Sequence, residues 1–308
     1  MTGGDIAEAR RALTRLDLFR DAAAEASVER LGGLTNLVFR VDHGGRSYCL
    51  RLPGKGTEEY IDRRNEQHAA RGAARAGVSP AVLLFDESGV MVTEYLHGTT
   101  TMSPRLFNTI PGAPGRAGRV FRRLHDSGET FTFRFELFGM IDGYLKVLST
   151  KDVVLPEGYH ETLAASQAVR EALAAHELPL RTCHCDPLAE NFLDAGDRMW
   201  IVDWEYSGMN DPMWDLGDLA VEAGFGPEQE EEMIRAYFGG EPGPAERGRI
   251  VIYKAMCDLL WTLWGLIQVA NKNPVDDFWA YSINRLTRCR GLMSDPRFTG
   301  HVEAVSRG

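Results

Sequence analysis

Basic residues are scarce in this 308-residue sequence, where 34 lysines and arginines stand against 44 aspartates and glutamates, a net charge of −10. No stretch concentrates positive charge, whereas a general nucleic-acid-binding protein needs a basic patch or a basic excess. Nucleic acid is therefore not an expected partner. The hydrophobic fraction of 44% and the charged fraction of 25% are ordinary for a globular protein. The length allows one large domain or two lobes.

Cysteine is also sparse. The five cysteines are odd in number and scattered along the chain, which argues against a disulfide framework and favours a reducing compartment. We therefore expect a cytoplasmic protein. The tripeptide Cys183-His184-Cys185 has the composition of a metal motif. A closed zinc site needs four ligands, usually as two spaced pairs, and no second Cys/His pair follows, so we assign no metal to it.

Long hydrophobic runs are missing as well. The most apolar segment, residues 255–270, is too short to span a bilayer and contains Asp258 and Gln268, so it predicts a buried helix. The first nineteen residues mix acids and arginines with apolar residues at helical spacing and lack the apolar centre of a secretory signal. Membrane insertion is not expected. Internal repeats and low-complexity tracts do not occur.

The predicted elements describe two unequal lobes. Residues 5–30 have the pattern of one or two helices. Two β-rich runs flank a hairpin turn at residues 43–45, the segment 58–77 is helical, and two more strands surround a turn at residues 87–89. After a zone rich in Gly, Pro, Ser and Thr, the pattern is helical nearly to the end, except for two short strands around residues 195–197.

This order predicts an α+β fold. We expect a small antiparallel-sheet lobe with one inserted helix at residues 1–96 and a larger, mainly helical lobe at residues 97–308. A hinge at residues 94–98 would join them.

One segment, "HCDPLAENFLDAGDRMWIVDWEYSG" at residues 184–208, concentrates residues suited to catalysis. Asp186 lies in a loop, where its carboxylate can accept a proton from a hydroxyl nucleophile. Asn191 offers an amide oxygen and Asp203 a carboxylate after a short apolar strand; Mg²⁺ takes few such protein ligands and completes its shell with water and phosphate. Each residue alone also fits a cap or a turn. Together, on a predicted β-hairpin, they are the parts that phosphoryl transfer needs.

This pattern resembles the catalytic core of the protein-kinase-like small-molecule kinases. The string "NFLDAGDRMWIVDWEYSGMNDPMWDLGDLA" is similar to the choline/ethanolamine kinase family, which is related to the aminoglycoside phosphotransferases. The resemblance covers about residues 31–286 and implies a bilobal protein-kinase-like fold that uses ATP and Mg²⁺. It implies Asp186 as the catalytic base and Asn191 and Asp203 as the magnesium ligands. The sequence departs from the family at Cys185-Asp186-Pro187, where Asn-Asp-Leu is usual, and keeps all three functional residues.

The resemblance also assigns residues of the small lobe to the nucleotide. Gly32 and Gly33, in the turn "LGGLTN", would allow close backbone approach to phosphate. Arg51 stands where related folds have a strand lysine and would pair with phosphate oxygens, oriented by Glu66 on the following helix. Taken alone, a glycine pair is an ordinary turn and Glu66 a solvated helix position. The backbone of the last small-lobe strand would face the adenine at two residues, Glu94 and Leu96.

Aromatic residues mark a possible acceptor pocket. Trp261 and Trp264 share one face of a predicted helix and, with Tyr281, match positions where choline kinases cage a trimethylammonium group. A quaternary ammonium has no hydrogen-bond donor, so ring faces hold it, at roughly 0.5–2 kcal/mol for each desolvated contact. Tyr206 is a further candidate wall, and Glu205 would add negative charge. The alternative is that the aromatic stripe is core and Glu205 forms an ordinary salt bridge.

The sequence therefore predicts an ATP- and Mg²⁺-dependent kinase that phosphorylates the hydroxyl of choline or a related amino alcohol. One alternative is a kinase of the same fold acting on another cationic alcohol, such as an aminoglycoside or thiamine. Another is a catalytically silent, nucleotide-binding regulator, although the presence of all three catalytic residues argues against it. Choline and ethanolamine both remain open at this point, as does the oligomeric state.

Overall fold

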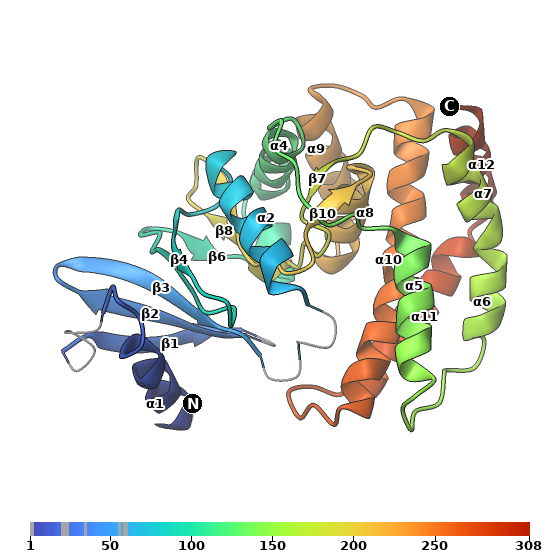
Figure 1. Cartoon of the computed structure of the whole chain (residues 1–308). Coiled ribbons are helices and arrows are strands. Elements are labelled where there is room, and N and C mark those ends of the chain that lie inside the picture. The colour runs from blue at the N-terminus through green and yellow to red at the C-terminus, as the bar shows by residue number, and fades with distance from the viewer. Residues whose placement is uncertain (1–2, 20–24, 34–35, 55–56, 58–60) are drawn as a thin grey trace.

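The computed structural model describes residues 3–19, 25–33, 36–54, 57 and 61–308. The sheet and α1 lie at one end of the molecule, and the helices of the second half of the chain lie at the other (Figure 1). We call the part up to β5 the small lobe and the part from β6 onward the large lobe. The elements of the small lobe are α1 (Gly3–Leu13), β1 (Ser27–Gly32), β2 (Leu37–His43), β3 (Arg46–Leu52), α2 (Arg63–Arg75), β4 (Val82–Phe85) and β5 (Met91–Glu94).

The large lobe is mainly helical, with short strands around the loop that follows α7. Its helices are α3 (Pro104–Thr109), α4 (Ala113–His125), α5 (Leu137–Leu148), α6 (Tyr159–Ala165), α7 (Gln167–Ala175), α8 (Met213–Glu222), α9 (Pro227–Phe238), α10 (Pro244–Ala270), α11 (Phe278–Met293) and α12 (Pro296–Arg307). Its strands are β6 (Thr100–Thr101), β7 (Arg181–Cys183), β8 (Phe192–Asp194), β9 (Met199–Ile201) and β10 (Gly208–Asn210).

The small-lobe sheet is antiparallel, in the order β1-β2-β3-β5-β4. The predicted hairpin at residues 43–45 is confirmed: His43 pairs with Arg46, and Gly44 and Gly45 have φ angles of 60° and 74°. Two consecutive positive φ angles match the twist of a two-residue hairpin, and glycine adopts them without strain. With the helical large lobe, this sheet confirms the predicted α+β class.

The N-terminal segment departs from the prediction. Helix α1 ends at Leu13, and residues from Ser27 form a strand in place of the helix expected up to residue 30; residues 20–24 of that segment lie outside the described residues. Ser27 pairs with Asp42, and the pairing continues along β2. A cross-strand partner thus overrides a local helical pattern.

Helix α2 begins later than predicted. Asp62 caps it, because the Asp62 side chain accepts hydrogen bonds from the backbone amides of Arg64 and Asn65. The first residues of the predicted helix, 58–60, lie outside the described residues. The predicted end is confirmed, since Gly77 follows the helix with a φ of 69°.

Two hydrophobic clusters divide the molecule unequally. The smaller one joins α1 to one face of the sheet, and the larger one fills the large lobe. Helix α2 contributes Ala69, Ala70 and Ala73 to the larger cluster, so it packs as part of both lobes. The chain passes to a different sheet between Glu94 and β6, which pairs with β8. The division at residues 96 and 97 stays a prediction, because α2 crosses it by packing.

The longest helix, α10, lies at the centre of the large lobe. Its length and composition would allow it to cross a membrane, but 89% of its most apolar 18-residue window is buried inside the fold. Helices α5, α8, α11 and α12 all pack against it. The apolar segment at residues 255–270 is thus the buried core helix that the sequence predicts.

Candidate active site

The catalytic segment folds as the predicted β-hairpin of β8 and β9. Asn191 ends a short 3₁₀ turn directly before β8, and Asp203 follows β9 by two residues. The Val202 amide donates to the Asn191 carbonyl at 2.9 Å, which closes the open end of the hairpin. The hairpin therefore brings the predicted amide and carboxylate ligands to the same end.

A buried carboxylate, that of Asp215, holds the loop that carries Asp186. Asp215 accepts hydrogen bonds from the backbone amides of His184 and Cys185, both at 2.8 Å. Cys185 and Asp203 are two of three non-glycine residues with positive φ among the described residues, at 69° and 68°. Such conformations persist where the surroundings enforce them, often at functional sites. Asp215 was not among the predicted site residues, although it lies in the string that carries the resemblance.

Cys183 belongs to this support. Its sulfur lies near His125 and Asp215, in a group with potential metal-binding atoms. Hydrogen bonds account for these groups, since His125 joins Asp215 at 2.9 Å and the hydroxyl of Tyr237 at 2.9 Å. Burial also raises the pKa of the Cys183 thiol well above its usual value. We read the cluster as structural, and all five cysteines are unpaired.

Asp186, Asn191 and Asp203 form a site that fits a magnesium ion and a base. The Asn191 amide nitrogen donates to the Asp186 carbonyl at 3.0 Å, which leaves the amide oxygen as a ligand. One buried oxygen of Asp203, Oδ1, accepts no hydrogen bond among the described residues. An amide and a carboxylate oxygen are ligands that Mg²⁺ prefers. Burial, followed by the charge of Glu222, raises the pKa of Asp186 well above the usual aspartate value.

Arg51 connects this site to the small lobe. It forms an ion pair with Glu66, and its Nη1 lies 3.5 Å from Asp203 Oδ1. The side chains of Arg51 and Glu66 are only 5% and 1% exposed, which excludes a solvated helix position for Glu66. The predicted pair is present, and it faces the proposed metal ligand across the two lobes.

Glu205 forms salt bridges with Arg51 and Arg63, which is the alternative that the sequence left open beside a role in the acceptor pocket. Its carboxylate accepts hydrogen bonds from Asn36 and Arg63, both at 3.2 Å, so it faces the small lobe and not the acceptor pocket. Residues 205 and 206 form a turn, and the Tyr206 ring lies against Trp261. The turn sends adjacent side chains to opposite sides, a reversal that spacing in the sequence does not reveal.

The nucleotide turn is only partly described, because residues 34 and 35 lie outside the described residues. Gly33 has a φ of 111°, and a Cβ there would lie 2.0 Å from the Asn36 carbonyl oxygen, so the position requires glycine. Gly32 has no such restriction. In the strand that leaves the small lobe, the Glu94 amide donates to the Ala81 carbonyl. The Leu96 amide donates to no acceptor among the described residues, so it could donate a hydrogen bond to an adenine ring.

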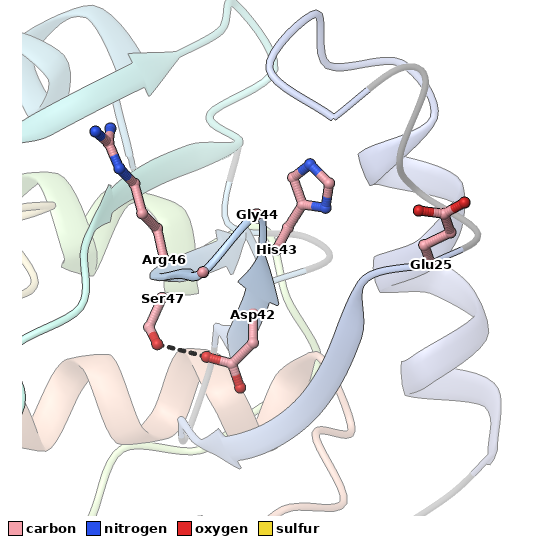
Figure 2. A pocket seen from close by; sticks show the side chains of 7 residues that line it. Glu25, Asp42, His43, Gly44, Arg46 and Ser47 are labelled. Carbon is pink, nitrogen blue, oxygen red and sulfur yellow. Dashed lines mark hydrogen bonds between the residues drawn. The ribbon is translucent and has the colours of Figure 1, made fainter.

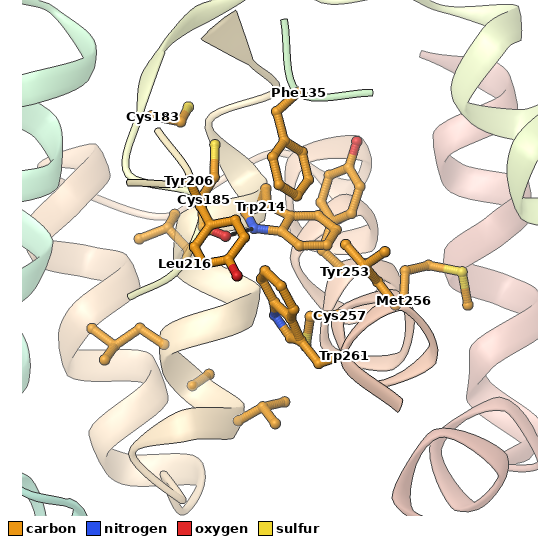
Figure 3. Close-up of a cluster of buried hydrophobic side chains, with 14 of the residues drawn as sticks. Phe135, Cys183, Cys185, Tyr206, Trp214, Leu216, Tyr253, Met256, Cys257 and Trp261 are labelled. Atoms are coloured by element: carbon orange, nitrogen blue, oxygen red, sulfur yellow. Dashed lines mark hydrogen bonds between the residues drawn. The ribbon is translucent and has the colours of Figure 1, made fainter. Parts of the chain in front are cut away.

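The predicted aromatic residues form two groups. The rings of Tyr206 and Trp261 meet edge to face at 5.2 Å (Figure 3), and the rings of Trp264 and Tyr281 meet at 5.8 Å. Trp261 and Trp264 are 3% and 7% exposed, so both also belong to the core. The core interpretation and the pocket interpretation therefore apply to the same side chains.

Two acidic residues on α8 lie next to the aromatic groups, Asp218 in contact with Trp261 and Glu222 paired with Arg285, which lies over the Tyr281 ring. Neither acid was among the predicted site residues. Asp218 and Glu222 are four residues apart and so share a helix face. Trp261 Nε1 donates to Asp218 at 3.4 Å, and Arg285 Nη2 lies 2.6 Å from Glu222. Burial, then Glu222 and Asp186, raises the pKa of Asp218 well above its usual value. The sequence signal for these residues is the four-residue spacing of Asp218 and Glu222, which places two acids on one face of a helix.

Two of these polar atoms have no partner. Asp218 Oδ1 and Trp264 Nε1 are buried and form no hydrogen bond among the described residues. Such atoms are costly inside a protein unless a ligand or water satisfies them. The acidic and aromatic side chains of α8, α10 and α11 thus form a candidate cation site beside Asp186.

A separate open hollow of about 550 Å³ lies at the turn between β2 and β3 (Figure 2). Its lining residues are Glu25 and residues 42–47, and none of the predicted site residues is among them. It therefore adds nothing to the active site.

Comparisons with known proteins show the family of this chain and its fold. The model of the phosphotransferase enzyme family matches residues 27–250. A solved choline/ethanolamine kinase family protein from Mesorhizobium loti is 62% identical, and the similarity covers 99% of this chain and 100% of that one with a TM-score of 0.90.

Two LicA structures are also similar. The choline kinase LicA from Streptococcus pneumoniae is 28% identical over 94% of this chain and 100% of its own, with a TM-score of 0.78. A structure of LicA in complex with AMP is 30% identical over 88% of this chain and 92% of its own, with a TM-score of 0.73. The predicted kinase-like fold is thereby confirmed. The chain belongs to the phosphotransferase enzyme family and, within it, to the choline/ethanolamine kinases, which transfer phosphate to an alcohol acceptor.

Proposed function

We propose that this protein transfers the terminal phosphate of ATP to the hydroxyl group of choline or a related amino alcohol, in a Mg²⁺-dependent reaction. The observation that carries the proposal is the approach of Arg51 Nη1 to Asp203 Oδ1, at 3.5 Å, beside Asp186. A buried cation that pairs with phosphate and a carboxylate that holds a metal are both needed where phosphate is transferred.

The chain's own residues supply the remaining steps. Asp186 accepts the proton of the acceptor hydroxyl. At the same time the hydroxyl oxygen bonds to the terminal phosphorus of ATP, and the bond between that phosphorus and the leaving ADP oxygen breaks. Arg51 neutralises phosphate oxygens, and Glu66 fixes its guanidinium. Bound between Asn191 and Asp203, Mg²⁺ would supply further charge neutralisation at the phosphates.

The acceptor pocket supports a cationic alcohol. Asp218 offers a buried carboxyl oxygen without a hydrogen bond among the described residues, and the rings of Trp261 and Trp264 offer faces to an ammonium group. Arg285 already pairs with Glu222 and lies over the Tyr281 ring, at 4.6 Å from its centroid, so these two side chains hold a cation of the protein itself. Glu222 raises the pKa of Asp186, which puts the base within electrostatic reach of this pocket. The solved relatives named as choline/ethanolamine kinase and as choline kinase favour the same acceptors.

A parallel assay tests the proposal. Release of ADP is measured with choline, ethanolamine, thiamine and an aminoglycoside as acceptors, with and without Mg²⁺. The expected result is turnover with choline or ethanolamine that requires Mg²⁺. Turnover confined to thiamine or the aminoglycoside would replace the acceptor. Binding of ATP with no ADP release on any alcohol would favour the silent regulator.

A further inference from the structure

Arg63, at the start of α2, lies inside the charged network between the lobes. Its Nη1 contacts Glu66 at 2.7 Å and Glu205 at 3.2 Å, and its Nη2 donates to Thr57. Its stem packs over Gly89, where a Cβ would lie 2.7 Å from the Arg63 Cδ. The side chain is only 11% exposed. Arg63 is therefore fixed by packing as well as by charge, and it spans the two lobes.

The network contains more negative than positive groups. Three carboxylates, those of Glu66, Asp203 and Glu205, have oxygens within 4.8 Å of one another. Two guanidinium groups, those of Arg51 and Arg63, face them. Arg51 Nη1 is already within 3.7 Å of Glu205. Without Arg63, the Arg51 guanidinium would be the cation left, among the described residues, to face all three carboxylates, of which Glu66 and Glu205 are 1% and 6% exposed.

We propose that Arg63 is a positioning residue for nucleotide binding. Arg63 pairs with Glu205 and Glu66, so that the Arg51 guanidinium stays available to the phosphates. This inference rests on the proposed function, because it takes the phosphates of ATP as the ligand of Arg51. Arg63 acts through two carboxylates and through Arg51. None of its contacts among the described residues lies in the acceptor pocket, so its effect should be confined to the nucleotide side.

The geometry separates this role from simple support of the fold. A purely structural arginine would affect both substrates through stability. A positioning arginine affects ATP selectively, and its loss is compensated when Glu205 loses its charge, because the competition for Arg51 then falls. The second effect is specific to the proposed role.

The test compares Arg63→Gln, Arg63→Lys and the double variant Arg63→Gln with Glu205→Gln in the full chain. Arg64→Gln is the matched control, since Arg64 is the next residue of α2, exposed and without an ion pair among the described residues. ATP affinity is measured by calorimetry without acceptor, together with the KM of ATP and of the acceptor and the melting temperature.

Arg63→Gln is expected to weaken ATP binding roughly tenfold or more, the effect of losing a charge-assisted contact, with the acceptor KM unchanged. Arg63→Lys should retain part of the affinity, and the double variant should bind ATP better than Arg63→Gln. The inference is overturned if Arg63→Gln binds ATP like Arg64→Gln, if both KM values rise together, or if the double variant shows no recovery. Wild-type protein that fails to bind ATP would instead refute the proposed function itself.

Discussion

Replacement of Trp264 by alanine tests whether the aromatic residues recognise the substrate or only fill the core. Trp264 is 7% exposed and packs against Phe278 and Tyr281, at 5.5 and 5.8 Å between ring centroids. Truncation of such a side chain costs about 3–5 kcal/mol of stability. For a chain of this size, that is a fall in melting temperature on the order of 5–15 °C. This loss is expected under either interpretation and cannot separate them.

The ratio of choline KM to ethanolamine KM does separate them. Choline loses a ring contact worth roughly 1–2 kcal/mol, which is about 5- to 30-fold in affinity. Ethanolamine should lose less, because its ammonium can donate hydrogen bonds to carboxylates. We expect Asp218, whose buried Oδ1 has no hydrogen bond among the described residues, to accept them in place of Glu205, which faces the small lobe.

Leu263→Ala is the control, since Leu263 is fully buried in the same helix and directly precedes Trp264. Its truncation should cost about 2–5 kcal/mol of stability. The KM ratio should stay at the wild-type value in this variant. Steady-state kinetics with both acceptors and thermal melting are the measurements. A Trp264→Ala variant that melts early but keeps the wild-type ratio would refute the cage and leave this helix face as core.

Four other predictions concern the phosphate side. Asp186→Asn should lower kcat by about 10²–10⁴ with the fold intact, and retention of over half the wild-type turnover would exclude Asp186 as the base. A catalytic base must be ionised, and the pKa of Asp186 is raised, mainly by burial. We therefore expect kcat/KM to fall as the pH drops through a pKa above the usual aspartate value. A pH profile whose acid limb lies at that usual value would contradict this expectation. Arg51→Ala should raise the KM of ATP more than that of the alcohol. It should also lower the melting temperature, because the buried Glu66 then keeps Arg63 but loses its second cation; Arg51→Lys should recover part of both, and a larger rise in the alcohol KM would show that Arg51 is misplaced. Asp203→Ala should abolish activity and weaken ATP binding only when Mg²⁺ is present, so an unchanged apparent affinity in a Mg²⁺ titration rules out the metal role.

The catalytic hairpin could be predicted from the sequence because its signals are local. Asn191 and Asp203 are joined by two short strands with a turn between them, and pairing of those strands alone brings them together. The hairpin at Gly44 and Gly45 is predictable for the same reason. The strand at Ser27 was mispredicted because its character depends on a partner strand and not on its own spacing.

Contacts between distant segments account for the misassigned and missed site residues. Glu205 lies 142 residues from Arg63 and 169 from Asn36, and its position follows from where the lobes meet. Asp218 is a candidate for the acceptor pocket because α10 places Trp261, 43 residues away in the sequence, in contact with it. A residue type and its spacing describe what a side chain can do locally, whereas its partners across the fold decide which substrate it serves.

The turn at residues 205 and 206 shows how these two levels combine. The side chain of Glu205, two residues after Asp203, contacts Arg63 of the small lobe, and the side chain of Tyr206, the next residue, contacts Trp261 of the large lobe. Substitutions at the two positions should therefore act on different substrates: Glu205→Gln on ATP through Arg51 and Arg63, and Tyr206→Leu on the alcohol through Trp261. Trp204, between Asp203 and Glu205 in the chain, is fixed by the hydrogen bond from its Nε1 to Ser79 at 3.0 Å and by its contact with His184, with ring centroids 4.9 Å apart. Because this buried ring anchors the turn, we expect Trp204→Leu to raise the KM of both substrates, whereas the substitutions at residues 205 and 206 each raise one.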